Sequence, residues 1–203
     1  MPELVTPVPV LLVVGLLAYL LGSVPFGIVM ARLFRLGDLR KVGSGNIGAT
    51  NVLRTGNKPA AFLTLLGDSG KGALGVLLAG AFLAGDAAQV AGLAAFLGHA
   101  WPLWLRFRGG KAVATFLGTA LALFFPLGLA LCVSWLAGAF ATRISSMGAI
   151  VAALSAPLWA WWLHPEAMAL MAFFAAMIVV FHRHNIQRIR AGEEPRIGAS
   201  KRA

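Results

Sequence analysis

Long apolar runs are the feature that most constrains this chain. Hydrophobic residues make up 59% of its 203 residues and charged residues only 12%, about half the charged share of a soluble domain. Several runs approach the roughly 20 residues that a helix needs to cross a bilayer. Because backbone groups in lipid must find partners inside the segment, such runs fold as helices. The sequence therefore predicts an all-α, polytopic membrane helical bundle that forms one domain over residues 1–203.

About seven transmembrane helices can be placed along the chain. The runs cover residues 8–30, 59–84, 87–105, 112–142, 147–163 and 167–181, and we divide 112–142 near Pro126 and Gly128 into two spans. Each half would have about 14 residues and rise roughly 21 Å. That is short of a roughly 30 Å hydrocarbon core. A tilted pair that crosses and a helical hairpin that stops short both stay open.

The basic residues predict the orientation. Sixteen of the 17 lysines and arginines fall in segments 32–58, 105–111, 143 and 182–203, whereas the opposite loops carry only Glu3, Asp86 and Glu166. The positive-inside rule then places the N-terminus outside and the C-terminus in the cytoplasm. Basic inner faces also follow from attraction to anionic lipids. The net charge of +10 therefore does not predict a nucleic-acid partner.

Four polar islands interrupt this apolar background, and the first reads GSGNIGATNVLR over residues 43–54. Its glycines let backbone N–H groups approach a ligand closely, and successive N–H groups form a concavity that suits phosphate. The spacing differs from that of a P-loop, so nucleotide binding is not implied. A polar turn between two membrane helices is the alternative.

The second island, GDSGKG, lies inside an apolar run. Asp68 and Lys71 are three residues apart and can face each other on a helix, and charges within a span favour a functional role. A structural ion pair is the equal alternative. In the third island, Gly109 and Gly110 precede Lys111 at the expected start of a helix, where backbone donors, dipole and charge suit an anion. His99, taken alone, is more typical of a satisfied helix-end histidine.

The fourth island, HRHNIQR over residues 182–188, leads to Glu193 and Glu194. On a continuing helix, His182 and Asn185 share a face. Histidine can move protons near neutral pH, and asparagine can hold a reacting oxygen. All four islands fall on the predicted cytoplasmic side. They predict one site there for one or two phosphorylated compounds, with the apolar bundle receiving a lipid chain.

Two other classes of function compete with an enzyme. A transporter for a small phosphorylated anion would place its site near the midplane and carry inverted repeats, and the sequence has no clear internal repeat. A structural or assembly protein would leave the histidine–asparagine pair and the glycine-rich loops unexplained. No cluster of metal-ligand residues stands out in the sequence, so no metal is expected.

The stretches GSGNIGATNVLR, GDSGKG, GHAWPLWLRFRGGKAVAT and HRHNIQRIRAGEE resemble, in this order, the bacterial PlsY family of acyl-phosphate:glycerol-3-phosphate acyltransferases. The resemblance implies a multi-pass enzyme of the inner (plasma) membrane with its active site at the cytoplasmic face. It would transfer a fatty acyl group from acyl phosphate to glycerol 3-phosphate, giving lysophosphatidic acid and phosphate. The resemblance implies no cofactor. It does imply a functional link to the enzyme that makes acyl phosphate. None of the four histidines has the H-x-x-x-x-D spacing of other glycerophosphate acyltransferases.

The resemblance also implies roles for individual residues. The catalytic residues would be Ser44, Arg54, His182 and Asn185. Either Glu193 or Glu194 would be structural, and Ala112 stands where many members are expected to have glycine. The residues predicted to bind substrate are Gly43, Asn46, Asn51, Asp68, Lys71, His99, Arg108, Gly109, Gly110 and Lys111.

The chemistry of an acyl phosphate needs no protein nucleophile, because the substrate is a mixed anhydride. Arg54, Lys111 and loop N–H groups would screen and position the phosphates. Asn185 and His182 would orient the attacking hydroxyl or the acyl carbonyl, and the leaving phosphate could act as base. A covalent acyl-Ser44 intermediate is the alternative.

Overall fold

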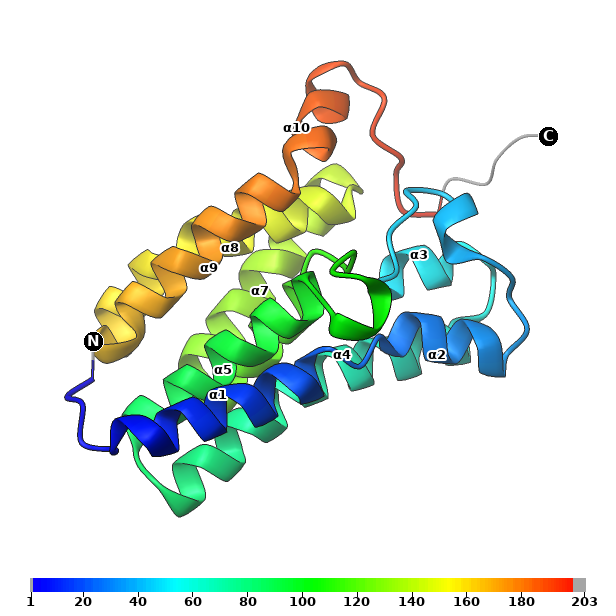
Figure 1. The fold of residues 1–203 in the computed structure, drawn as a ribbon. Helices are drawn as coiled ribbons and strands as arrows, with labels where there is room; N and C mark the ends of the chain where they lie inside the picture. The colour runs from blue at the N-terminus through cyan, green and yellow to red at the C-terminus, as the bar shows by residue number, and fades with distance from the viewer. Residues whose placement is uncertain (1, 199–203) are drawn as a thin grey trace. The chain divides into compact units, whose positions relative to one another are not determined.

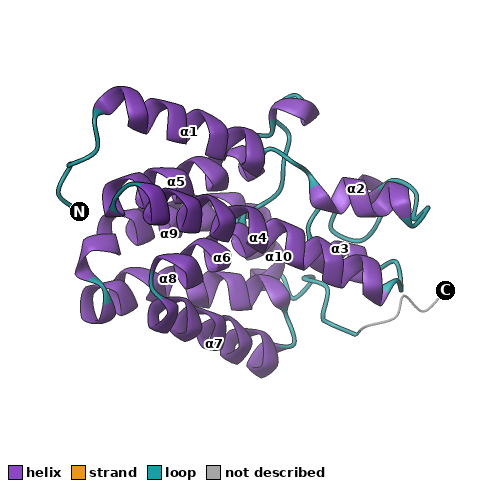
Figure 2. Ribbon diagram, turned by 90° about the horizontal axis from the view of Figure 1, so that it is seen from below, coloured by secondary structure: helices purple, strands orange, loops and turns teal. Residues whose placement is uncertain are grey.

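The computed structural model describes residues 2–198, and every regular element within them is a helix (Figures 1 and 2). The prediction of an all-α fold is confirmed. The chain divides into two compact units, one comprising Pro2–Gly128 and the other beginning at Leu129. The boundary falls inside helix α7. A single domain over residues 1–203 stays a prediction.

The N-terminal unit is arranged around one long helix, α4 (Lys58–Phe82), which packs on five others. Those neighbours are α1 (Val8–Gly22), α2 (Phe26–Leu33), α3 (Ala49–Leu53), α5 (Gly85–Ala100) and α6 (Val113–Leu123). Short 3-10 turns cover Leu39–Lys41 and Leu103–Leu105.

Small residues allow these helices to approach closely, as expected for a membrane bundle. A Cβ on Gly118 of α6 would lie 2.1 Å from the Ser69 carbonyl oxygen of α4. A Cβ on Gly22 of α1 would lie 2.3 Å from the Ala95 carbonyl oxygen of α5. Only glycine fits at either place, so the abundant glycines set the spacing between helices.

The second unit contains most of α7 (Phe125–Thr142), followed by α8 (Ser145–Leu163), α9 (Met168–Phe181) and α10 (Arg183–Arg190). A 3-10 turn over Pro165–Ala167 joins α8 to α9, and these two helices pack together. A Cβ on Gly148 would lie 2.5 Å from the Trp135 carbonyl oxygen. Close packing therefore also holds α7 and α8 together.

Within residues 2–198, four segments are long and apolar enough to cross a membrane, so the chain is a multi-pass membrane protein. They are Val8–Leu33, Lys58–Phe82, Phe125–Thr142 and Ser145–Leu163, with a fifth if α9 and α10 count as one span bent by 59°. Helices α5 and α6, with 16 and 11 residues, were both expected to be spans. The count of seven and the orientation of the termini stay predictions.

The predicted division of the run 112–142 near Pro126 is confirmed, because the helix breaks at Phe124, which is extended with φ −156° and ψ 109°. The two parts are not the equal spans that were expected, since α6 has 11 residues and α7 has 18. Pro126 lies in the first turn of α7, where its missing N–H costs nothing. The expectation of a helix that continues through His182 is wrong, since α9 and α10 meet there at an angle of 59°.

Candidate active site

The first polar island is organised by the side chain of Asn51, which is 2% exposed. Its Nδ2 donates to the carbonyl oxygens of Leu39 at 2.8 Å and Asn46 at 2.7 Å. Its Oδ1 accepts the Ser44 N–H at 3.1 Å. One buried amide thus holds three points of the loop, so Asn51 contributes by shaping this loop.

Arg54 lies close to Gly43, the residue before Ser44. Gly43 has φ +52°, and a Cβ on it would lie 2.6 Å from Asn51 Oδ1 and 2.7 Å from Arg54 Cδ. The Arg54 side chain therefore lies against Gly43, next to the exposed Ser44. The expected nest of phosphate-binding N–H groups is only partly present. The Ser44 N–H is used by Asn51, and the Gly45 N–H donates to the Val42 carbonyl oxygen at 2.9 Å.

The second island forms a buried group of charges that we call the Asp68 cluster, made of Asp68, Lys71 and His99. Lys71 Nζ donates to Asp68 Oδ1 at 3.0 Å, which confirms the predicted pairing across one helical turn. His99 Nδ1 lies 3.4 Å from the same oxygen, within ion-pair reach but without hydrogen-bond geometry. All three residues are at most 5% exposed. Burial favours the structural alternative over substrate binding for these side chains.

The Asp68 cluster also connects four elements. Lys71 Nζ donates to the Val24 carbonyl oxygen at 2.9 Å, in the break between α1 and α2. It also lies 5.9 Å from the centre of the Phe26 ring. Thr115 Oγ1 of α6 donates to the Asp68 carbonyl oxygen at 2.9 Å. A charge in an apolar bundle needs such partners, and here they fix α4 against its neighbours.

The glycine–lysine loop of the third island packs directly on the Asp68 cluster. The N–H groups of Gly109 and Gly110 donate to the carbonyl oxygens of Ala100 and His99, each at 3.1 Å. The expectation that these two N–H groups bind phosphate is therefore wrong, because they close a turn instead. A Cβ on Gly110 would lie 2.2 Å from His99 Nε2. Glycine is needed here so that the loop can reach the histidine.

Lys111 and Ala112 follow this turn at the start of α6. Ala112 caps the helix with φ +57°, a left-handed conformation that favours glycine. This conformation gives a physical reason for expecting glycine here.

The 3-10 turn Leu39–Lys41, which precedes the first island, also contacts the third island. A guanidinium N–H of Arg40 donates to the Arg108 carbonyl oxygen at 3.1 Å. Nothing in the sequence pattern indicates a partner for Arg40 that lies 68 residues away. The structure therefore joins the three islands of the N-terminal unit through Arg40 and His99.

The fourth island has its own acidic centre, the Glu194 cluster, made of Glu194, Ser146, Asn185 and Arg188. Ser146 Oγ donates to Glu194 Oε1 at 2.7 Å and Asn185 Nδ2 to the same oxygen at 2.5 Å. Arg188 Nε donates to Oε2 at 2.7 Å. Burial alone would raise the pKa of the Glu194 carboxyl. Hydrogen bonds from Asn185, Ser146 and Arg188 outweigh burial and hold that pKa below its ordinary value of 4.5.

These contacts distinguish the two glutamates, since Glu194 is buried and Glu193 is exposed. The sequence did not single out Ser146, because its partner lies 48 residues away. His182 is buried at the bend, and its Nδ1 lies 2.8 Å from the Ile178 carbonyl oxygen. A carbonyl only accepts, so Nδ1 carries a hydrogen. Among residues 2–198, no group of three or more histidines, cysteines, aspartates or glutamates could hold a metal ion.

Comparison with known proteins gives consistent results over nearly the whole chain. A family model described as glycerol-3-phosphate acyltransferase matches residues 12–192. A glycerol-3-phosphate acyltransferase of a Jannaschia species is 64% identical over 185 residues, 91% of each chain. One from Dinoroseobacter shibae is 56% identical over 203 residues, all of both chains.

Solved structures are also similar. The crystal structure of PlsY, an integral membrane glycerol 3-phosphate acyltransferase, in its glycerol 3-phosphate form has a TM-score of 0.87 and 38% identity. That match covers 93% of this chain and 96% of the other. The lysophosphatidic acid form of PlsY has a TM-score of 0.84 and 35% identity, over 93% and 95% of the two chains.

Proposed function

The chain belongs to the PlsY family of glycerol-3-phosphate acyltransferases, and from that premise we propose that it transfers a fatty acyl group from an acyl phosphate to glycerol 3-phosphate. The products are 1-acyl-glycerol 3-phosphate and phosphate, and the reaction is the first acylation of phospholipid synthesis. The observation that carries the proposal is the match of residues 12–192 to the family. The same proposal places the enzyme in the inner membrane, with its site at the cytoplasmic face.

The reaction needs positioning more than covalent chemistry from the protein. A hydroxyl oxygen of glycerol 3-phosphate bonds to the acyl carbonyl carbon. The bond from that carbon to the bridging phosphate oxygen breaks, and phosphate leaves with the electron pair. The hydroxyl proton goes to the departing phosphate, which acts as base. The protein must therefore hold two phosphate-bearing substrates in attacking geometry and stabilise the charge on the reacting oxygens.

The N-terminal unit supplies cationic groups for this task. Arg54 is held against Gly43, next to Ser44, an exposed residue whose hydroxyl donates to Asn51 Oδ1 at 3.4 Å. We assign Arg54 and Lys111 to the phosphates, since guanidinium and ammonium groups bind phosphate with charge-assisted hydrogen bonds. Ser44 donates a further hydrogen bond. Asn51 supports this group by fixing the loop that carries it.

Asn185 and His182 orient the reacting groups. The Glu194 carboxylate only accepts, so its bond from Asn185 Nδ2 fixes which way the amide faces. The bond between His182 Nδ1 and the Ile178 carbonyl oxygen likewise places a hydrogen on Nδ1 and fixes the orientation of the ring. Both side chains are thus held in one orientation before substrate arrives.

The Asp68 cluster acts by positioning. Its three members touch one another and the protein interior, and His99 contacts the turn that ends at Lys111. We assign it the role of holding that turn. A substitution in the cluster should therefore change the KM for glycerol 3-phosphate more than it changes binding of the acyl donor.

The direct test uses the purified protein with palmitoyl phosphate and glycerol 3-phosphate. Phosphate release should require both substrates and should disappear in Lys111→Ala. The matched control, Lys58→Ala, removes an exposed lysine at the start of α4 and should retain activity. Uptake of glycerol 3-phosphate into vesicles without formation of an acyl product would favour the transporter and overturn the proposal.

A second experiment separates direct transfer from a covalent intermediate. The enzyme is mixed with labelled acyl phosphate in the absence of acceptor, quenched and digested. Direct transfer predicts no labelled peptide, because no protein oxygen bonds to the acyl carbon. A labelled peptide containing Ser44 would establish the acyl-enzyme route.

A further inference from the structure

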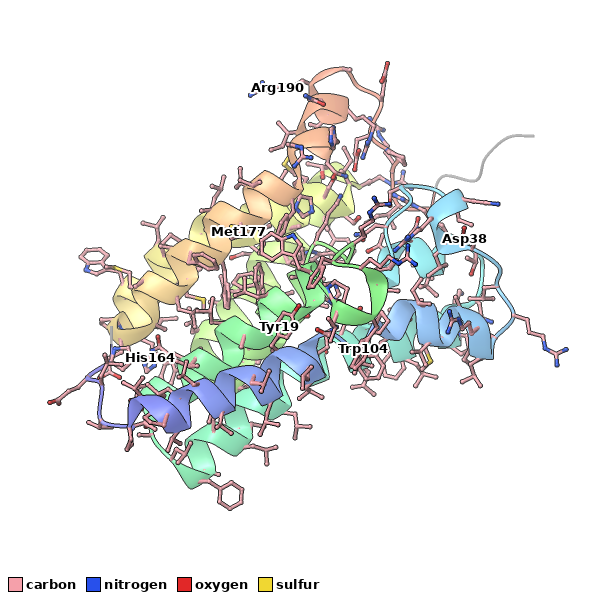
Figure 3. All side chains as sticks on the ribbon, viewed as in Figure 1. Tyr19, Asp38, Trp104, His164, Met177 and Arg190 are labelled. Carbon is pink, nitrogen blue, oxygen red and sulfur yellow. The ribbon has the colours of Figure 1, made fainter. Side chains whose placement is uncertain are left out.

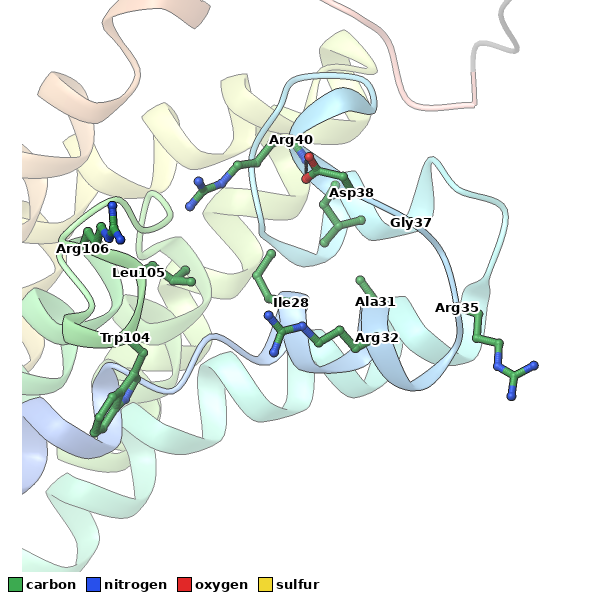
Figure 4. A pocket seen from close by; sticks show the side chains of 11 residues that line it. Ile28, Ala31, Arg32, Arg35, Gly37, Asp38, Arg40, Trp104, Leu105 and Arg106 are labelled. Atoms are coloured by element: carbon green, nitrogen blue, oxygen red, sulfur yellow. Dashed lines mark hydrogen bonds between the residues drawn. The ribbon is translucent and has the colours of Figure 1, made fainter.

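A basic groove of about 680 Å³ lies beside α2 in the N-terminal unit, apart from the side chains assigned to catalysis (Figure 4). Four arginines line it, namely Arg32, Arg35, Arg40 and Arg106. Figure 4 shows Arg32 and Arg40 directed toward the side where Arg106 and Trp104 lie, while Arg35 points away. Pockets of 300 to 1,000 Å³ are typical of small-ligand sites.

The charges of this groove are not balanced within the part of the chain that the structure describes. The one carboxylate in the lining belongs to Asp38, and its Oδ1 accepts the backbone N–H of Arg40 at 3.0 Å. None of the ion pairs found among residues 2–198 includes any of the four arginines. The guanidinium groups of Arg32, Arg40 and Arg106 favour an anion, above all a phosphate, which arginine can bind through two parallel hydrogen bonds.

The remaining lining is apolar, which favours an amphiphile over a free ion. Ile28 and Ala31 of α2 form one wall, and Trp104 and Leu105 form another. Trp104 is 60% exposed, and tryptophan is enriched where a membrane meets water. A ligand with a phosphate and an adjoining apolar part would satisfy both kinds of surface.

The position of the groove along α2 also matches the depth of lipid headgroups. Residues Val8–Leu33 form a candidate span, and Arg32 and Arg35 stand at its end. Leu33 beside them is 68% exposed, as expected for a side chain that faces lipid. Basic pockets at such places bind anionic headgroups.

We propose that this groove binds the headgroup of an anionic glycerophospholipid, with the phosphate among Arg32, Arg40 and Arg106 and the glycerol region against Trp104. Arg40 also donates to the Arg108 carbonyl oxygen. The lipid would therefore lie beside the Gly109–Gly110–Lys111 turn without occupying it.

Quenching of Trp104 fluorescence tests the proposal directly. The full chain is placed in phosphatidylcholine nanodiscs that contain increasing fractions of brominated phosphatidylglycerol or brominated phosphatidylcholine. The Trp104 signal is the difference between the wild type and Trp104→Phe. We expect quenching to saturate with phosphatidylglycerol at low mole fraction and to rise only in proportion to lipid with phosphatidylcholine.

Charge variants sharpen this experiment. Arg32→Gln combined with Arg106→Gln should raise the half-saturating fraction of phosphatidylglycerol by roughly thirtyfold. Arg190→Gln, which removes an exposed arginine of α10 (Figure 3), should leave it unchanged. Because the exposed arginines make few contacts, the double variant should unfold at the wild-type temperature. The readout needs no turnover, so its failure would leave acyl transfer intact.

Three results would overturn the lipid site. The two brominated lipids could quench equally, or the double variant could bind like the wild type. Alternatively, inorganic phosphate at millimolar concentration could displace phosphatidylglycerol completely, which would identify the groove as a site for free phosphate.

Discussion

The Asp68 cluster and the Glu194 cluster each hold one carboxylate through side chains from other parts of the chain, but they differ in how far solvent reaches them. Each places one carboxylate where several elements meet, and each holds a segment that carries predicted site residues. The Asp68 cluster lies on α4 and α5, with Lys71 and Asp68 side chains only 1% and 2% exposed. The Glu194 cluster lies where the chain leaves α10, and its Arg188 side chain is 35% exposed.

The two surroundings determine how much each carboxylate depends on its partners. Removal of one member of a buried ion pair leaves an uncompensated charge, whereas solvent can replace part of an exposed pair. The Asp68 cluster should therefore be the more sensitive of the two. Its role should appear in stability and glycerol 3-phosphate binding, while that of Glu194 should appear in pH dependence.

The largest effect is expected from Lys71→Met. This change leaves Asp68 buried without its cation, so the free energy of unfolding should fall by about 3–5 kcal/mol. Reversible unfolding in mixed detergent micelles measures it. The double variant Asp68→Leu with Lys71→Met removes both charges and should recover most of the loss. If the single variant were as stable as the wild type, the Asp68 cluster would not hold the bundle.

Gly110→Ala tests the contact between the Asp68 cluster and the lysine turn. The new Cβ would lie 2.2 Å from His99 Nε2, so the turn must move. Misplacement by about 1 Å can lower kcat/KM by roughly 100-fold, and we expect the loss mainly in the KM for glycerol 3-phosphate. Gly70→Ala is the control, because a Cβ there meets nothing within 4 Å. If Gly110→Ala and Gly70→Ala had equal kinetics, the contact between His99 and this turn would have no influence on substrate binding.

Glu194→Gln should have a smaller effect that depends on pH. The pKa of Glu194 in the folded state lies below its ordinary 4.5. Its contribution is therefore complete above about pH 4.5 and is lost as pH falls through the folded-state pKa. At pH 7 the variant should lose about 1–2 kcal/mol, a value reduced by solvent around Arg188.

Thermal unfolding between pH 3 and pH 7 measures this difference. The wild type and Glu194→Gln should converge as the pH falls, because protonation removes the same charge that the substitution removes. Glu193→Gln changes an exposed neighbour and should follow the wild type throughout. A constant gap between wild type and Glu194→Gln would show that charge is not the source of the stability.

Structural features that depend on residues close together in the chain could be predicted from the sequence. The helices follow from the apolar runs, and the break between α6 and α7 follows from Pro126 and Gly128, close to where it occurs. The Asp68–Lys71 pair follows from the spacing of one helical turn. The family resemblance, confirmed by the comparisons, added the predicted site residues that no local rule supplies.

The contacts that join the islands could not be predicted in this way. His99 meets Asp68 from another helix, and Arg40 meets Arg108 across 68 residues. Such pairs depend on how helices pack, which a single sequence does not specify. The sequence also suggested more backbone N–H groups available to a ligand than the structure has. The N–H groups of Gly109 and Gly110 look available in the sequence, but both close a turn on α5.

The smallest expected effect compares two threonines one turn apart on α6. Thr115 Oγ1 donates to the Asp68 carbonyl oxygen, whereas Thr119 Oγ1 is buried with no hydrogen-bond partner among the described residues. Valine has nearly the same shape but no hydroxyl. Thr115→Val should therefore lower the free energy of unfolding by about 1 kcal/mol, and Thr119→Val should raise it by about as much.

Unfolding of both variants under one set of conditions gives the signs directly. Opposite signs would mean that the hydroxyl of Thr115 belongs to the Asp68 cluster and that the hydroxyl of Thr119 only loses hydration. Two losses of equal size would mean that α6 depends on both hydroxyls, and the Asp68 cluster would then have no special hold on this helix. This pair is sensitive because the two substitutions match in volume, helix and depth, so only the hydrogen bond differs.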